Sequence, residues 1–263
     1  MNTLPIVPPR ATRKGFRVVR KVKWMAAFIA VVFLLPAAAS AAWWSLQERP
    51  ATWRAANWRS SGVLPPAEAA DAGVYVLAAR TGGMKGAISV HSWLVLKKPG
   101  ATSYDRYDKV GWGSPIRRNA YDADGFWYSN RPWVALEVTG KAAERLIPQV
   151  EAAIAAYPHS QSGGYTIWPG PNSNSFVAHV LDAVPALGAR APANATGRDF
   201  ATGHVSLRVA PDWRDVHVTL GGLAGFAAGA RSGIEIHFLG LTAGLDLARP
   251  ALKVPAFGRV SLR

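Results

Sequence analysis

The stretch AISVHSWLVLK, residues 87–97, is the strongest strand signal in the chain. Successive side chains of a strand point to opposite faces, so His91, Trp93 and Val95 share one face. The other face carries Val90, Ser92, Leu94 and Leu96. His91 therefore lies among apolar residues, where an imidazole either has a buried structural partner, which is the commoner case, or lines a site.

Further strands are expected on both sides of this stretch, and helices after it. Alternation of apolar residues predicts strands, and apolar residues three and four positions apart predict helices. The expected strands are 74–79, 104–112, 133–139, 205–209, 216–220 and 233–239, and the expected helices are 141–157 and 174–184. Pro148 predicts a local distortion of the first helix. This order predicts an α+β domain followed by a glycine-rich β extension.

The N-terminal segment predicts a membrane anchor. Residues 24–46, WMAAFIAVVFLLPAAASAAWWSL, contain no charged residue, and residues 1–23 hold seven Lys and Arg and no acid. Some 20 apolar residues in a helix cross about 30 Å of hydrocarbon, and Trp24, Trp43 and Trp44 lie where an aromatic belt would sit. The basic cluster predicts a cytoplasmic N-terminus, an inner-membrane anchor and a C-terminal domain in the periplasm of a Gram-negative cell.

A cleaved signal peptide is the alternative, with residues 25–36 as its apolar region and small residues 37–41 as the cleavage site. Either interpretation exports residues 45–263. The chain is thus expected to divide into five parts. These are a basic cytoplasmic arm (1–23), an anchor (24–46), a juxtamembrane linker (47–73), an α+β domain (74–203) and a β-rich C-terminal extension (204–263).

Composition excludes several kinds of chemistry. The absence of cysteine excludes disulfides, cysteine-ligated zinc, iron–sulfur clusters and a cysteine nucleophile. The formal net charge is +14, of which the N-terminal arm supplies seven, and the remainder contains no nucleic-acid-binding motif, so we expect no nucleic-acid partner. No histidine spacing typical of a metal site and no phosphate-binding glycine motif is present, so no metal and no cofactor are expected.

The segment YTIWPGPNSNSF, residues 165–176, combines a rigid turn with a helix start. Asn172, Ser173, Asn174 and Ser175 crowd this start, and the simpler interpretation is that they cap free N–H groups. The alternative is that Ser173 sits where the helix dipole and free N–H groups stabilise an alkoxide or an oxyanion. Such a serine needs a base, and His91 is the best candidate.

Four motifs in order resemble a bacterial membrane-associated family known as domain of unknown function 3750. They are HSWLV (91–95), YDRYDKVGWG (104–113), YTIWPGPNSNSFVA (165–178) and GLDLARPALKVPAFGR (244–259). The resemblance covers roughly residues 74–263 and implies no activity.

A more distant resemblance is to circularly permuted papain-like proteins of the NlpC/P60 superfamily. Those proteins place a histidine on an early strand and, later, an Asn-Cys pair that opens a helix before a Phe-Val. Here His91 and the run Asn172 to Val177 follow that order, with Ser173 in place of the cysteine. The resemblance implies a papain-like antiparallel sheet and a polar residue that orients the histidine, for which Asp105 and Asp108 are available.

Three functions remain open at this stage. The first is a hydrolase or acyltransferase acting on an amide or ester in peptidoglycan or lipid, with Ser173, His91 and either Asp105 or Asp108 as its catalytic residues. The second is a catalytically silent papain-like module that binds such a ligand. Its binding residues would be Trp93, Trp112, Trp127, Trp168, Asn172 and Asn174. The third is a structural role at the membrane, in which this chain binds an unknown protein and its own aromatic residues are part of the hydrophobic core.

Overall fold

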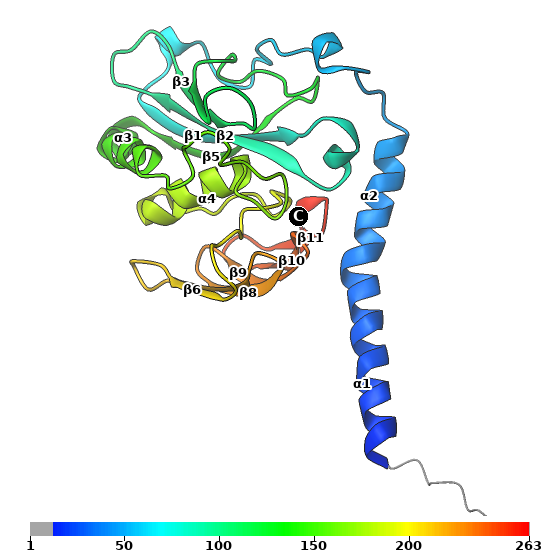
Figure 1. The fold of residues 1–263 in the computed structure, drawn as a ribbon. Helices are drawn as coiled ribbons and strands as arrows, with labels where there is room; N and C mark the ends of the chain where they lie inside the picture. The colour runs from blue at the N-terminus through cyan, green and yellow to red at the C-terminus, as the bar shows by residue number, and fades with distance from the viewer. Residues whose placement is uncertain (1–12, 263) are drawn as a thin grey trace, which may run out of the picture.

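The computed structural model describes residues 13–262, so Arg10 and the rest of residues 1–12 of the expected arm lie outside the described residues. One long helix opens the chain and stands beside the folded body (Figure 1). It consists of α1 (Arg13–Ile29), a π-helical turn η1 (Ala30–Leu34) and α2 (Leu35–Ser45). The segment Arg17–Ser45 is long and apolar enough to cross a membrane. The helix thus includes the expected span and extends into the basic arm.

The first sheet has five antiparallel strands in the order β4-β3-β2-β1-β5. Their bounds are β1 (Gly73–Arg80), β2 (Val90–Lys97), β3 (Asp105–Lys109), β4 (Ile116–Arg118) and β5 (Trp133–Thr139). Strand β2, which contains His91, is the middle strand, and every one of its residues is buried. It pairs with β1 along its whole length, from Val90 opposite Arg80 to Lys97 opposite Gly73.

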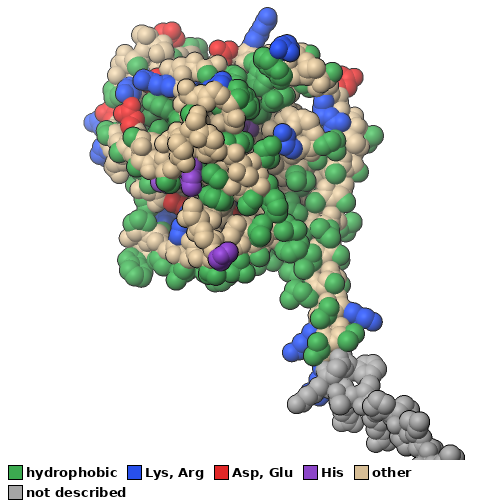
Figure 2. All heavy atoms as spheres, in the orientation of Figure 1, with side chains coloured by type: hydrophobic (Ala, Val, Ile, Leu, Met, Phe, Trp, Pro, Cys, Tyr) green, Lys and Arg blue, Asp and Glu red, His purple; other side chains and the backbone are tan. Residues whose placement is uncertain are grey.

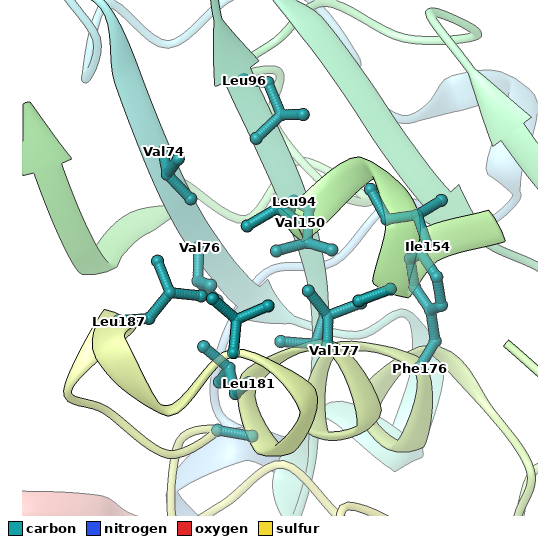
Figure 3. Packing of buried hydrophobic residues seen from close by; sticks show 14 of the residues in the cluster. Val74, Val76, Leu94, Leu96, Val150, Ile154, Phe176, Val177, Leu181 and Leu187 are labelled. Carbon is teal, nitrogen blue, oxygen red and sulfur yellow. The ribbon is translucent and has the colours of Figure 1, made fainter. Parts of the chain in front are cut away.

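Two helices cover one face of this sheet, α3 (Gly140–Ala155) and α4 (Ser173–Ala183). Val76 and Leu94 of the sheet pack against Val150 of α3 and Val177 of α4, forming the larger core (Figure 3). Helix α3 continues through Pro148, the position at which the sequence predicts a local distortion. The exposed position of Pro148 lets the chain tolerate one missing hydrogen bond.

Aromatic residues cover the other face of the first sheet. Trp93 and Val95 of β2 join a second core with Trp127, and Trp58 of the segment after the helix packs against it. That segment is held by Asp124, whose carboxylate accepts hydrogen bonds from the Ser60 hydroxyl and from backbone N–H groups. Alternation predicted two faces for residues 90–96, and each of them packs against a separate core.

The second sheet has seven antiparallel strands in chain order. They are β6 (Ser206–Val209), β7 (Asp215–Leu220), β8 (Ala224–Gly229), β9 (Gly233–Phe238), β10 (Leu241–Asp246), β11 (Ala251–Val254) and β12 (Gly258–Ser261). This sheet lies below α4 in Figure 1, next to the long helix. The chain is an α+β protein with two antiparallel sheets and one N-terminal helix that could span a membrane.

The long helix contacts both sheets of the body. The Ser40 hydroxyl donates to the Ala87 carbonyl at 2.6 Å, and Trp44 Nε1 donates to the Gly83 carbonyl at 2.9 Å, both in the turn between β1 and β2. Further down the helix, Phe33 packs against Phe238 of the second sheet with ring centroids 5.6 Å apart. The helix is therefore attached along its side as well as through the chain.

Candidate functional site

A buried charged group surrounds His91 at the start of β2. His91 Nε2 lies 2.8 Å from Asp108 Oδ1 on β3. Arg106, two residues earlier on β3, donates to both Asp108 oxygens, from Nε at 2.7 Å and from Nη2 at 2.9 Å. The register that pairs Val95 with Arg106 puts Arg106 and Asp108 on the face of β2 that carries His91.

Burial and charge set the protonation of this pair in opposite ways. Burial lowers the pKa of His91, and the hydrogen bond and charge of Asp108 only partly offset that effect. Burial opposes ionisation of Asp108, but Arg106 and the His91 hydrogen bond outweigh it and lower the pKa of Asp108 to about 2. Near neutral pH the pair is therefore a neutral imidazole held by a carboxylate, with its Nδ1 as the second ring nitrogen.

Aromatic rings fix the orientation of the imidazole. The Trp127 ring stacks on His91 with centroids 3.7 Å apart and planes 10° apart. Trp93 lies behind them, with the Arg106 guanidinium 4.0 Å from its ring centroid. Stacking on one side and a hydrogen bond at Nε2 leave the ring little freedom to rotate.

The N-terminus of α4 carries the candidate serine. Asn172 is the cap, because its Oδ1 accepts from the backbone N–H of Asn174 at 2.9 Å and of Ser175 at 3.1 Å. Ser175 completes a capping box by accepting from the Asn172 N–H. Ser173 occupies the first helical position, and none of the hydrogen bonds among residues 13–262 engages its hydroxyl or its backbone N–H. The capping interpretation thus applies to Asn172 and Ser175 and leaves Ser173 uncommitted.

Asn174 ties this helix start to the strand on which His91 lies. Its Nδ2 donates to the Val90 carbonyl at 2.9 Å, and its Oδ1 accepts from the Ser92 hydroxyl at 2.7 Å. Val90 and Ser92 flank His91, and Ser173 precedes Asn174. The hydrogen bonds of Asn174 to Val90 and Ser92 therefore hold Ser173 and His91 close to each other.

His91 and Ser173 line the same cavity, of about 840 Å³. Trp112, Trp127, Trp168, Asn172 and Asn174 also line this cavity. Trp112 and Trp168 are about half exposed, at 49% and 43%, so their rings are available to a ligand. A cavity of this size, with apolar walls and a few polar groups, is the usual form of a small-molecule site.

Three of the proposed site residues, Trp93, Asp105 and Asp108, do not line this cavity. Trp93 is fully buried, and its Nε1 donates to the Ala123 carbonyl at 2.9 Å, so it supports Trp127 and Arg106 from behind. Asp105 lies on the other face of β3 and pairs with Arg118 at 2.8 Å. Of the two carboxylates that the sequence left open, Asp108 is the one that contacts His91.

Sequence reasoning missed two residues of the site. Arg106 neutralises Asp108. The alternation in the run Arg106-Tyr107-Asp108 indicates that Arg106 and Asp108 share one face of the strand, but only the strand register shows that this face also carries His91. Lys109 also lines the cavity, fully buried, and its Nζ donates to the His159 carbonyl at 2.6 Å. Burial lowers the pKa of Lys109.

One group of described residues, outside this cavity, has the composition of a metal site. Asp199, His217 and His237 each offer a ligand atom, and these atoms lie within 4.8 Å of one another. Arg198 and Arg190, however, lie within 3.5 Å of the Asp199 carboxylate. Two guanidinium groups already balance this carboxylate and would repel a divalent cation, so the arrangement favours a buried hydrogen-bonded charge network.

The comparisons with known proteins give a family and no activity. No curated protein and no solved structure matches the chain. A family model does match, over residues 71–200, which include β1 to β5, α3, α4 and both His91 and Ser173. Those residues form a domain of the family described as protein of unknown function (DUF3750).

Proposed function

We propose that the cavity is the active site of a serine hydrolase or acyltransferase that acts on an amide or ester of the cell envelope, in peptidoglycan or lipid. Ser173 is the nucleophile, His91 the general base and Asp108 the residue that orients His91. One observation carries the proposal: His91, held by the buried Asp108 behind it, and the uncommitted Ser173 at a helix N-terminus line one cavity. In this proposal the fold is the permuted papain-like one, with serine in place of cysteine.

Acyl transfer would proceed by the chemistry of a Ser-His-Asp triad. His91 Nδ1 takes the proton of the Ser173 hydroxyl while the oxygen attacks the carbonyl carbon. The imidazolium then returns that proton to the leaving alcohol or amine, which leaves an ester on Ser173. Water or a second alcohol repeats the step, and His91 receives and returns its proton again.

The start of α4 supplies the stabilisation of the negative oxygen. The N-terminus of a helix carries a partial positive charge and free N–H groups. The Ser173 N–H lies in this first turn, and the Asn172 side chain, which accepts from the N–H groups of Asn174 and Ser175, does not bind it. A donor placed at the developing oxyanion typically contributes about 10²–10³ in rate.

A silent binding module is the second candidate, and Arg106 favours it. Its guanidinium neutralises Asp108, so the carboxylate stabilises a developing imidazolium less than an unpaired carboxylate would. In this candidate Trp112 and Trp168 hold an envelope ligand without chemistry. Ligand-dependent thermal stabilisation of the full chain, without turnover, would identify it.

We further propose that the long helix anchors the chain in the inner membrane and that the body faces the periplasm. The basic residues at the start of the helix, among them Lys21 and Lys23, support this orientation, because such residues stay on the cytoplasmic side. Protease added outside intact spheroplasts is expected to digest the body.

Fluorophosphonate labelling tests the catalytic proposal. The full chain, purified in detergent, is treated with the probe, and the intact mass shows whether one adduct forms. Ser173→Ala and His91→Ala are expected to abolish the adduct. Ser89→Ala is the matched control, because Ser89 also lines the cavity but bonds to the Val90 carbonyl at 3.3 Å. No adduct on a chain with native circular dichroism would contradict the proposal and favour the binding module.

A further inference from the structure

The second sheet has its polar face inside the molecule. One row of registered residues crosses all of its strands on this face, namely Arg208, His217, Ala227, Glu235, Gly244, Lys253 and Arg259. Glu235 is fully buried and bonds to both Arg198 and Lys253. Asp199 joins the same interior through His217 and His237. The sheet is thus held to the body mainly by ion pairs and hydrogen bonds.

The opposite face of the sheet is apolar and largely exposed, and the long helix covers the part around Leu241 and Ala243. The adjacent registered row consists of Val209, Val216, Ala228, Ile234, Leu245, Leu252 and Val260. Ile234 is 53% exposed, and Leu245, Leu252 and Val260 are each more than 40% exposed. The next row continues the pattern with Leu207, Val218, Phe226 and Ile236. An exposed apolar surface of this extent marks a surface that contacts lipid or another protein.

The long helix shows which of these environments surrounds the face. Phe33, in the middle of the apolar span, is buried against Leu241, Ala243 and Phe238 of the outward face. Figure 2 shows hydrophobic side chains along the base of the body and on the adjoining helix. If the helix is in hydrocarbon at Phe33, the part of the sheet in contact with it is in hydrocarbon too.

The depth follows from the geometry of the helix. Trp43 and Trp44 mark one end of the span, where Arg80 lies over both rings. Trp24 and Lys23 mark the other end. Ten positions separate Phe33 from Trp43, which at about 1.5 Å per residue places Phe33 about 15 Å below the tryptophans. This depth lies well inside a hydrocarbon layer of about 30 Å.

We propose that the outward face of the second sheet is a membrane-embedded surface, in contact with the acyl chains of the outer leaflet. The inverted faces follow from this environment, because apolar side chains face lipid at no cost while charged groups must pair inside. A second copy of the chain fits less well. Protein interfaces normally surround their apolar centre with a polar rim, whereas the registered row is apolar from β6 to β12.

Spin labels on single cysteines test this proposal, and the cysteine-free chain needs no background substitutions. Full chains with Ile234→Cys or Leu252→Cys are labelled with a nitroxide and reconstituted in vesicles of phosphatidylethanolamine and phosphatidylglycerol. Accessibility to dissolved oxygen, which concentrates in hydrocarbon, is compared with accessibility to an aqueous nickel chelate. Val31→Cys, on the exposed side of the span, is the lipid reference, and Gln149→Cys, on the exposed side of α3, is the water reference.

Both sheet labels are expected to collide with oxygen as Val31→Cys does and to be protected from nickel. Access to nickel as high as that of Gln149→Cys would overturn the proposal. Protection from both reagents would also overturn it, because it would show that a second protein surface covers the face. A Val31→Cys label that reports water would remove the basis of the proposal, since the helix would then lie outside the bilayer.

Discussion

The two sheets of this protein bury opposite kinds of residue. Strand β2 of the first sheet packs Leu94 against the helices on one face and Val95 against aromatic rings on the other. Strand β9 of the second sheet buries Glu235 and turns Ile234 outward. Both strands alternate regularly, so alternation defines two faces of a sheet without deciding which one is inside. The surrounding medium determines which face is buried. Water favours burial of the apolar face, whereas lipid favours burial of the polar face.

The largest expected difference in stability is between substitutions at two neighbouring residues of β9. Glu235→Ala removes the buried carboxylate that pairs with Lys253 and leaves Arg198 only its longer contact with Asp199, and we expect a loss of about 3–5 kcal/mol in the free energy of unfolding. Ile234→Ala should cost within about 0.5 kcal/mol, because its side chain faces the surrounding detergent or lipid rather than the core. Guanidinium titration of the full chain in micelles measures both values. A larger loss for Ile234→Ala would show that the face is covered.

The same substitution in the two sheets should give the next largest contrast. Leu94 is fully buried between β2 and the helices, so Leu94→Ala leaves a cavity and should cost about 2–5 kcal/mol. Leu245→Ala, at a position 42% exposed on β10, should again cost within about 0.5 kcal/mol. Equal losses in unfolding experiments would remove the distinction between the sheets.

The first sheet was largely predictable from the sequence because its signals are local. Strand β5 has the expected bounds, and β2 and both helices begin or end within a few residues of expectation. Strand β4 lies within residues 113–132, where no strand was expected, because its run of two arginines carries no hydrophobic signal. Strand β8, AGFAAG, has little β propensity of its own and forms between β7 and β9.

The candidate site was predictable in its residue types but not in its pairing. Both His91 and Ser173 could be chosen from the sequence, because an isolated histidine on an apolar strand and a serine at a helix start are local features. The choice between Asp105 and Asp108 depends on the register of β3 against β2, a contact between distant segments. The inward direction of the second sheet's polar face likewise depends on Arg198 and Asp199, which precede the sheet in an irregular loop.

His91, Arg106 and Asp108 form a buried polar group in the first sheet, and Asp108→Asn tests their role. If Asp108 orients the base, fluorophosphonate labelling should slow by about 100-fold, equivalent to about 2.7 kcal/mol. The Asp108 charge raises the pKa of His91, so the pKa of His91 should be lower in the variant. The labelling rate of the variant should therefore reach its plateau at a lower pH than that of the native chain. A merely structural carboxylate would not move that pH profile.

Asp105→Asn is the matched control for this change, because Asp105 lies on the same strand but pairs with the exposed Arg118. Its labelling rate should stay within about twofold of the native chain, as expected for a screened surface pair. If both variants slow equally, with native circular dichroism, neither carboxylate orients His91 and the catalytic proposal loses its third residue.

The smallest expected effect concerns the contact of each sheet with the long helix. Ser40→Ala removes the hydrogen bond to the buried Ala87 carbonyl beside the first sheet, and in lipid such a bond contributes about 0.6–1.7 kcal/mol. Phe33→Leu, beside the second sheet, exchanges one apolar side chain for another where acyl chains fill the remaining space, so its cost should be lower. Thermal unfolding of the full chain in vesicles compares the two variants. A larger shift for Phe33→Leu would mean that the second sheet is packed against the helix as in a water-soluble core, and its outward face would then need a cover other than lipid.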